Sequence, residues 1–277
     1  FTIDIPAIMG VMSALVLAFI LGIGISKVKD SSLLKVFEEF NSIVLMIVTN
    51  VLIPLVPIYI CCIFAKLSFS GEIFTTLKSF AIVYAVLFSL QAIYILIQYS
   101  IASVIKKENP FKLIKNMLPA YFTAMGTQSS AATIPVTLQC VKSNNVGEEI
   151  AEFVVPLGAT IHLAGDTITL VITSMAVMYM NGQVPTLSQV IPFIFMLGVT
   201  MIAAPGVPGG GVMAALGLLE TMFGFGSIEK PIMIALHAAQ DSFGTATNIT
   251  GDGAIAVIVD YLINKKDNES NVELESA

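Results

Sequence analysis

The sequence contains no arginine, so lysine supplies all thirteen of its basic residues. Bidentate recognition of a carboxylate or phosphate by a guanidinium group is therefore excluded. Charged residues of both signs make up only 12% of the 277 residues, and they form no basic patch that would suggest nucleic-acid binding. The three cysteines, Cys61, Cys62 and Cys140, lie in or beside apolar segments, which argues against a disulfide framework or a cysteine metal site.

Apolar residues are in excess, at 56% of the chain against about 45–50% in soluble domains. Three uncharged runs in the first part of the chain are each long enough for the roughly 20 helical residues that cross a bilayer. They span residues 5–25, 43–64 and 80–105. The sequence therefore predicts an all-α membrane protein that is surrounded by the lipid bilayer.

The second half of the chain alternates interrupted apolar segments with apolar segments that carry polar residues. Residues 113–141 are broken by Gly-Thr-Gln-Ser-Ser, and residues 190–225 by a stretch rich in proline and glycine. Each half is too short to span, so we predict two re-entrant hairpins, whose irregular backbone must be satisfied by protein or water. The polar segments 154–179 and 232–263 follow one hairpin each. Paired interruptions of this kind point to a transporter binding site.

The lysines predict the orientation of the chain in the membrane. If the C-terminus is cytoplasmic and the spans alternate, ten lysines face the cytoplasm and three face outside. This asymmetry agrees with the positive-inside rule. We therefore expect a multi-pass protein of the plasma membrane with a cytoplasmic C-terminus.

The last polar segment places oxygen-bearing side chains on one helical face. Asp241, Thr245, Asn248 and Asp252 are spaced by four, three and four residues, so they stack on neighbouring turns. Intramembrane carboxylates normally face a partner or a cavity, and this set suits Na⁺ or an ammonium group. The alternative is a purely structural network, but three glycines between positions 244 and 253 would weaken such a helix. These glycines either unwind the helix or let neighbouring helices approach.

Two further kinds of candidate lie in the interruptions and in the polar segments. Ser129, Ser130 and the glycine-rich residues 206–211 can present free backbone N–H groups at helix starts, where anionic groups bind; a plain turn is the alternative. The only histidines, His162 and His237, are either hydrogen-bonded packing residues or proton carriers.

Four ordered motifs give the chain a specific resemblance to one transporter family. They are Ser-Ser-Ala-Ala-Thr-Ile-Pro-Val-Thr at 129–137, Pro-Leu-Gly-Ala-Thr-Ile at 156–161, Gly-Val-Pro-Gly-Gly-Gly at 206–211 and Asn-Ile-Thr-Gly-Asp at 248–252. Over essentially its whole length the chain resembles the dicarboxylate/amino acid:cation symporters, which include the glutamate transporters. The resemblance implies eight spanning helices, two re-entrant hairpins, a homotrimer and an elevator mechanism.

The resemblance also implies a division of the chain into three parts. Residues 1–70 correspond to the fourth and fifth family helices, in the scaffold, residues 71–264 to the sixth helix and the transport core, and residues 265–277 to a polar tail. The first three family helices have no counterpart. Because the chain begins without methionine directly before a span, we expect residues to be missing at its start.

Site residues are carried over position by position from the same resemblance. The implied substrate-binding residues are Ser129, Ser130, Gly206, Val207, Asp241, Thr245 and Asn248. The implied cation-binding residues, with Na⁺ as the ion, are Gly158, Thr160, Ile202, Ala204, Asn248 and Asp252. In this assignment Asp241 holds the substrate amino group and Asn248 its α-carboxylate. The protein is then not an enzyme, and it needs no cofactor besides its coupling ions.

One departure from the family pattern concerns the substrate. Gly244 and Gln128 stand where family members carry the arginine that binds acidic substrates. We therefore predict symport of a neutral amino acid or similar small solute. The alternatives are symport of an acidic amino acid or dicarboxylate without arginine, an anion or solute channel, and a membrane binding protein that does not transport.

A second departure concerns ion coupling. His162, Ala164 and His237 replace oxygen ligands of the family's sodium machinery, while Asp166 adds a carboxylate nearby. One hypothesis is that His162, His237 and Asp166 make one coupling step proton-dependent, or that a sodium site is deleted. The equally weighted alternative is that Asp166 pairs with a histidine structurally.

Overall fold

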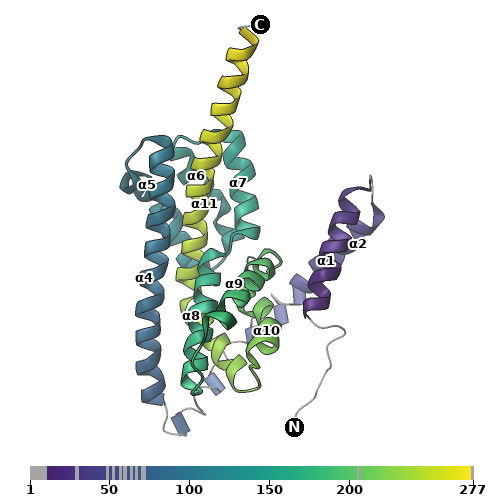
Figure 1. Ribbon diagram of the computed structural model, residues 1–277, viewed down its shortest axis with the longest axis vertical. Helices are drawn as coiled ribbons and strands as arrows, with labels where there is room; N and C mark the ends of the chain where they lie inside the picture. Colours follow the sequence, from purple (N-terminus) through teal and green to yellow (C-terminus); the bar gives the residue numbers. More distant parts are fainter. Residues whose placement is uncertain are drawn as a thin grey trace.

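The computed structural model describes residues 11–28, 31–47, 73–204, 206 and 208–275, together with scattered residues between 50 and 69. Regular secondary structure in this part of the chain is entirely helical, as predicted. The helices shown in Figure 1 are α1 (Val11–Ser26), α2 (Ser32–Ile47), α4 (Ile73–Lys106), α5 (Pro110–Thr127), α6 (Ser130–Ser143), α7 (Glu148–Ile161), α8 (Ala164–Met180), α9 (Leu187–Ile202), α10 (Gly210–Phe223) and α11 (Glu229–Glu275).

Three stretches within the described residues are long and apolar enough to cross a membrane. They are Phe80–Lys106, Glu148–Met180 and Glu229–Asn264. The first of them lies in α4, whose surface is mostly exposed, as expected for a helix that faces lipid or another helix layer. The second predicted span, residues 43–64, lies only partly within the described residues.

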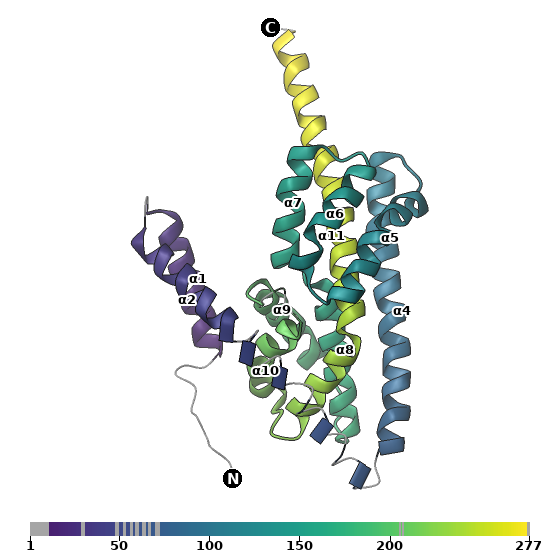
Figure 2. The same cartoon turned by 180° about the vertical axis from the view of Figure 1, so that it is seen from behind.

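Two helical hairpins form where the sequence predicted them. α5 and α6 lie side by side, as do α9 and α10 (Figures 1 and 2). These four helices contain only 14 to 18 residues, fewer than the roughly 20 that a bilayer requires. Gln128 adopts a left-handed conformation at φ 51°, which ends α5, and the Ser129 side chain caps α6 by accepting from the Ala132 N–H.

The two polar segments differ from each other in a way that the sequence did not reveal. The predicted helix 154–179 is two helices, α7 and α8, separated at His162 and Leu163. The last segment, in contrast, is one helix of 47 residues that runs unbroken through Asn248 and Asp252. Unwinding of that segment, one of the two expectations for its glycines, is therefore wrong.

The glycines instead let other helices approach α11. A Cβ atom on Gly165 of α8 would lie 2.3 Å from the Gly244 carbonyl oxygen. A Cβ atom on Gly251 would lie 2.5 Å from His162 Cε1, and one on Gly253 would lie 2.7 Å from the Tyr99 hydroxyl. Because no side chain fits at these positions, α11 can pack directly against the backbone of α8 and the side chains of α4.

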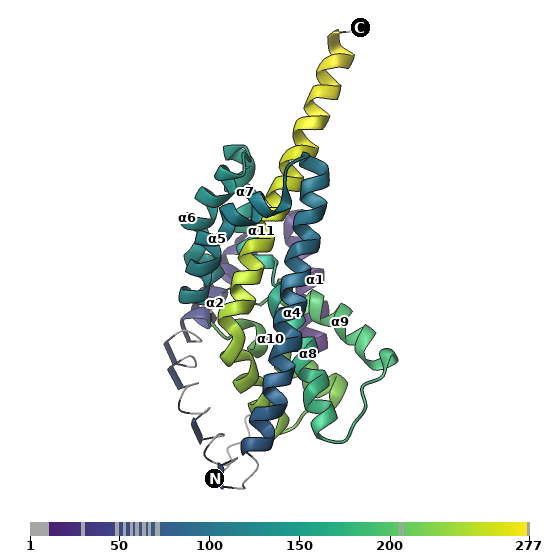
Figure 3. The ribbon, with the colours of Figure 1, turned by 90° about the vertical axis from the view of Figure 1, so that its left-hand side faces the viewer.

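Two apolar clusters lie along α11, which runs through the middle of the helix bundle beside α4 (Figure 3). One cluster surrounds its C-terminal half and includes Tyr99, Met117, Val155, Ile249 and Val257. The other surrounds its N-terminal part and includes Leu170, Phe193, Leu218, Met233 and Leu236. The α11 segment between the two clusters carries the buried polar residues His237, Gln240, Asp241 and Thr245, while Asn248 and Asp252 lie within the stretch that the first cluster surrounds.

Candidate functional site

The tips of the two hairpins meet next to the end of α7. We call residues 128–130 the first tip and residues 203–209 the second tip; Pro205 and Val207 of the second lie outside the described residues. Ser129 Oγ donates to the Gly206 carbonyl oxygen at 3.1 Å. Gly206 also lies against α7, since a Cβ there would be 2.8 Å from the Ala159 carbonyl oxygen. The contact between the tips therefore closes one side of the space beside α11.

Nine residues from both hairpins, α8 and α11 line a small cavity behind the tips. They are Gln128, Ser130, Leu163, Asp166, Gly206, Gly211, Asp241, Thr245 and Asn248. The cavity has a volume of about 10 Å³, which is close to the room of one water molecule. Five of the predicted substrate-binding residues line this cavity, while Ser129 lies at the tip contact and Val207 is outside the described residues.

Asp241 connects α11 to the start of α10. Its Oδ2 atom accepts from the backbone N–H of Gly209 at 2.8 Å. Gly209 has φ 73°, a left-handed conformation that favours glycine, and it directly precedes α10. The carboxylate thus lies at a helix N-terminus, where unpaired N–H groups and the helix dipole stabilise negative charge.

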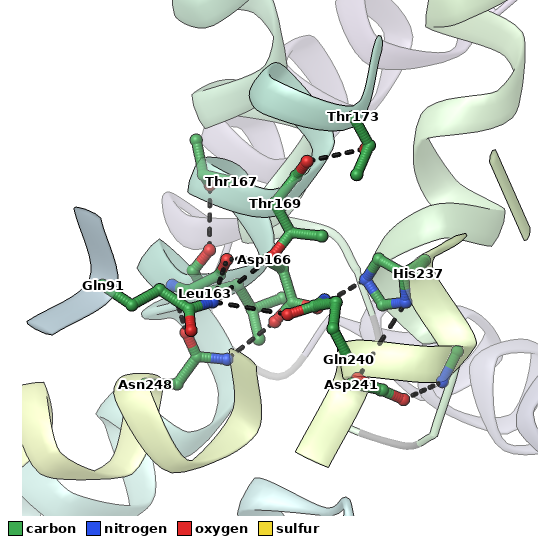
Figure 4. A network of polar contacts seen from close by, with 12 residues as sticks. Gln91, Leu163, Asp166, Thr167, Thr169, Thr173, His237, Gln240, Asp241 and Asn248 are labelled. Carbon is green, nitrogen blue, oxygen red and sulfur yellow. Dashed lines mark hydrogen bonds and ion pairs between the residues drawn. The ribbon is translucent and has the colours of Figure 1, made fainter. Parts of the chain in front are cut away.

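Asp166 joins α8 to α11 through a buried hydrogen-bond network, drawn in Figure 4. Its Oδ1 atom lies 2.8 Å from His237 Nε2, and its Oδ2 atom accepts from Asn248 Nδ2 at 2.7 Å. Asn248 Oδ1 in turn accepts from the Gly165 N–H at 2.7 Å. Ligand atoms of Asp166, His237 and Asp241 all lie within 4.8 Å of one another.

A second polar cluster lies around Asp252, which is completely buried. Its Oδ1 atom is 2.8 Å from His162 Nδ1, while Oδ2 has no hydrogen-bond partner among the described residues. His162 Nε2 lies 3.1 Å from the Tyr94 hydroxyl, which accepts from Gln98 Nε2 at 2.8 Å. Each histidine is thus paired with a different aspartate, and one buried carboxylate oxygen of Asp252 has no hydrogen-bond partner among the described residues.

The predicted cation-binding residues are distributed over four places. Gly158 lies directly against Asp252, because a Cβ there would be 2.4 Å from Asp252 Oδ1. Asn248 belongs instead to the Asp166 network. The Thr160 hydroxyl donates to the Leu157 carbonyl of its own helix at 2.7 Å. Ile202 is exposed and Ala204 is buried at the second tip.

The sequence reasoning missed three residues on α4, which it treated as an ordinary span. The Tyr94 hydroxyl contacts His162, and Gln98 donates to that hydroxyl. Gln91 Nε2 lies 3.3 Å from both Thr169 Oγ1 and Gln240 Oε1. Positions 91, 94 and 98 are three and four residues apart, so they share one helical face. This polar stripe within an apolar run was the signal that could have revealed them.

The comparison with known proteins decides the family. The sequence profile of the sodium:dicarboxylate symporter family matches residues 3–262. The chain belongs to the sodium:dicarboxylate symporter family. The family and the curated relatives are transporters rather than enzymes, in agreement with the sequence prediction.

Curated members of the sodium:dicarboxylate symporter family show moderate similarity to the chain. It is 27% identical over 270 residues to an excitatory amino acid transporter of Caenorhabditis elegans, covering 96% of the chain and 53% of that protein. It is 29% identical over 172 residues to neutral amino acid transporter A of Homo sapiens, covering 62% and 32%. It is 30% identical over 171 residues to human excitatory amino acid transporter 1, covering 61% and 31%. The chain therefore spans about half or less of these relatives' length.

Proposed function

We propose that the protein performs secondary active symport of a neutral amino acid or similar small solute, coupled to Na⁺, H⁺ or both. The observation that carries this proposal is the contact of both hairpin tips over a cavity lined by Asp241, Thr245 and Asn248. Relatives named as neutral and as excitatory amino acid transporters support an amino-acid substrate. In this proposal Asp241 holds the substrate ammonium group, and Asn248 with the first tip holds its carboxylate.

The charge of the cavity favours a neutral amino acid over an acidic one. The ionisable residues that line it are Asp166 and Asp241, both carboxylic acids. Gln128 lines it as well, and its Nε2 donates to Ser242 Oγ at 2.9 Å. A substrate with a side-chain carboxylate would add negative charge where no arginine is available to pair with it.

Coupling ions are proposed to bind at two places. Asp252, with its free Oδ2 atom and the adjacent Gly158, is the proposed principal Na⁺ site, because Na⁺ prefers oxygen ligands. Thr160 with the backbone of Ile202 and Ala204 forms the second proposed site. His162, His237 and Asp166 are either proton-coupling groups or structural pairs, as the sequence left open.

The larger assembly follows from the family likeness and is proposed on that basis. Residues 1–70 belong to a scaffold, residues 71–264 to a moving transport core, and three copies assemble as an elevator in the plasma membrane. The hairpins α5–α6 and α9–α10 enter and leave the membrane on the same side, in agreement with their short helices. The C-terminus is cytoplasmic.

Uptake in proteoliposomes tests the proposal. We expect accumulation of L-alanine or L-serine against its gradient when an inward Na⁺ or H⁺ gradient is imposed, and no accumulation of L-glutamate. Asp241→Asn is the matched control, and it should abolish accumulation. Passive equilibration without accumulation would instead indicate a channel, and preferred uptake of glutamate would indicate recognition of acidic substrates without arginine. Unchanged pH dependence in His162→Asn and His237→Asp variants would end the proton-coupling hypothesis.

A further inference from the structure

His237 offers an acceptor atom that the proposed function does not use. Its Nδ1 atom is buried and has no hydrogen-bond partner among the residues that the structure describes. It faces Asp241 Oδ1, one helical turn further along α11, at 4.0 Å (Figure 4). An unpaired acceptor buried beside a carboxylate is unfavourable unless a donor lies between them. The pair therefore marks a place for a group that carries at least two donor hydrogens.

The surrounding hydrogen bonds assign the proton on the His237 ring. The backbone N–H of Gly165 can only donate, so the atom of Asn248 that faces it is Oδ1. The amide nitrogen of Asn248 then donates to Asp166 Oδ2. An ionised carboxylate can only accept, so His237 Nε2, which lies 2.8 Å from the other oxygen of Asp166, Oδ1, carries the proton of this contact. With its proton on Nε2, a neutral imidazole keeps a lone pair on Nδ1.

The distance to Asp241 agrees with this assignment. A protonated Nδ1 would form a charge-assisted hydrogen bond of about 2.7–2.9 Å with the carboxylate, but the separation is 4.0 Å. One ammonium nitrogen about 2.8 Å from each acceptor would reach both, with an angle of roughly 90° between the two bonds. The Gly209 N–H is bonded to Asp241 Oδ2, which leaves Oδ1 for this ligand.

We propose that His237 is a second acceptor for the substrate ammonium group, which bridges His237 Nδ1 and Asp241 Oδ1. Asp166 is the positioning residue, since its bond to Nε2 turns the Nδ1 lone pair toward the ligand. The inference rests on the proposed function and adds a selectivity to it. A primary ammonium has three donor hydrogens and a secondary one has two, enough for both acceptors, whereas a tertiary one has a single hydrogen and a quaternary one has none.

Two substitutions of His237 separate its two ring nitrogens. In His237→Gln the amide nitrogen replaces Nε2, so the donor to Asp166 remains while the Nδ1 acceptor is removed. In His237→Asn the amide oxygen can replace Nδ1, so the acceptor remains while the donor to Asp166 is removed. The dissociation constants of L-alanine and its N-methyl, N,N-dimethyl and N,N,N-trimethyl derivatives are measured by thermal stabilisation of the purified full chain in NaCl.

The wild-type protein should bind L-alanine and N-methyl-alanine well and should lose affinity at the dimethyl derivative. His237→Gln should bind L-alanine about 10- to 100-fold more weakly, the range for a hydrogen bond to a charged group, with little change for the trimethyl derivative. His237→Asn should keep more of the preference for L-alanine over the trimethyl derivative than His237→Gln does. The midpoint of unfolding without ligand identifies a variant that has not folded, and the wild-type series then still tests the inference.

Several results would overturn this inference. Equal weakening of all four ligands in His237→Gln would show a merely structural residue. An unchanged ratio of L-alanine to trimethyl-alanine affinity, or a wild-type protein indifferent to methylation, would exclude the second acceptor while leaving the proposed function intact. If no neutral amino acid stabilises the wild-type protein with Na⁺, the proposed function itself fails, and this inference fails with it.

Discussion

The tight contact between the backbones of α8 and α11 makes Gly165→Ala a sharp test of the architecture. The added Cβ would lie 2.3 Å from the Gly244 carbonyl oxygen and 2.9 Å from the Gly244 carbonyl carbon and Cα. These are backbone atoms within α11, so they cannot rotate away as a side chain could. Ordinary contact begins near 3.4 Å, so α8 and α11 must separate locally by the difference between 2.3 and 3.4 Å, or 1.1 Å.

This separation has an energetic cost and a consequence for the site. Overpacking of a well-packed contact costs about 1–3 kcal/mol. The bond from the Gly165 N–H to Asn248 Oδ1, 2.7 Å long, crosses the same contact, and a shift near 1 Å would break it, adding about 0.5–1.5 kcal/mol. The sum, roughly 1.5–4.5 kcal/mol, corresponds to a lower midpoint of thermal unfolding by roughly 3–18 °C.

The assay is the thermal unfolding of purified protein together with the dissociation constant for the best-binding neutral amino acid. Gly198→Ala on α9 is the matched control, because its Cβ would meet nothing within 4 Å. That variant should be neutral or more stable by about 0.5–1 kcal/mol, since alanine favours a helix over glycine. If Gly165→Ala unfolds at the wild-type temperature and keeps its ligand affinity, the close packing of α8 on α11 is refuted.

Three smaller substitutions test the tips and the α4 stripe. Ser129→Ala removes the donor to the Gly206 carbonyl, so the substrate dissociation constant should rise about 2- to 12-fold; an unchanged value would show that the tip contact does not contribute to closure. Tyr94→Phe removes the hydroxyl next to His162, so the Na⁺ concentration that gives half-maximal amino-acid binding should rise several-fold, while the amino-acid affinity at saturating Na⁺ should not change. An equal loss of amino-acid affinity at saturating Na⁺ would contradict a role of Tyr94 at the Na⁺ site. Gly209→Ala forces a side chain into φ 73°, so stability should fall by about 1–2 kcal/mol in thermal unfolding, and full retention would argue against the left-handed turn.

Much of the site's composition was evident from spacing along one helix. The positions of Asp241, Thr245 and Asn248 on successive turns predicted a common face, and all three line the cavity. Helical periodicity is a local property, so a sequence states it directly. The same reasoning located both hairpins, because an apolar run with a polar interruption can neither span a bilayer nor remain unsatisfied within it.

The partner of each histidine could not be predicted in the same way. The sequence allowed Asp166 to pair with either histidine, whereas the fold pairs it with His237 and leaves His162 to Asp252. These contacts join residues that are 71 and 90 positions apart in the sequence, and they depend on how closely the glycines let neighbouring helices approach α11. The stripe on α4 was overlooked for a similar reason, since the role of uncharged polar residues in an apolar run depends on which residues of other helices they contact.

The sequence by itself thus determined the membrane class, the family, the two hairpins and the oxygen-rich face of α11, because hydropathy, motif order and helical spacing are written along the chain. Only the tertiary structure decided that α7 and α8 separate at His162, that α11 remains continuous, and that each histidine faces its particular aspartate. The physical reason is that a hydrogen bond requires two groups within about 3 Å. Distances between remote segments are set by packing across the whole bundle, and no short stretch of sequence determines that packing.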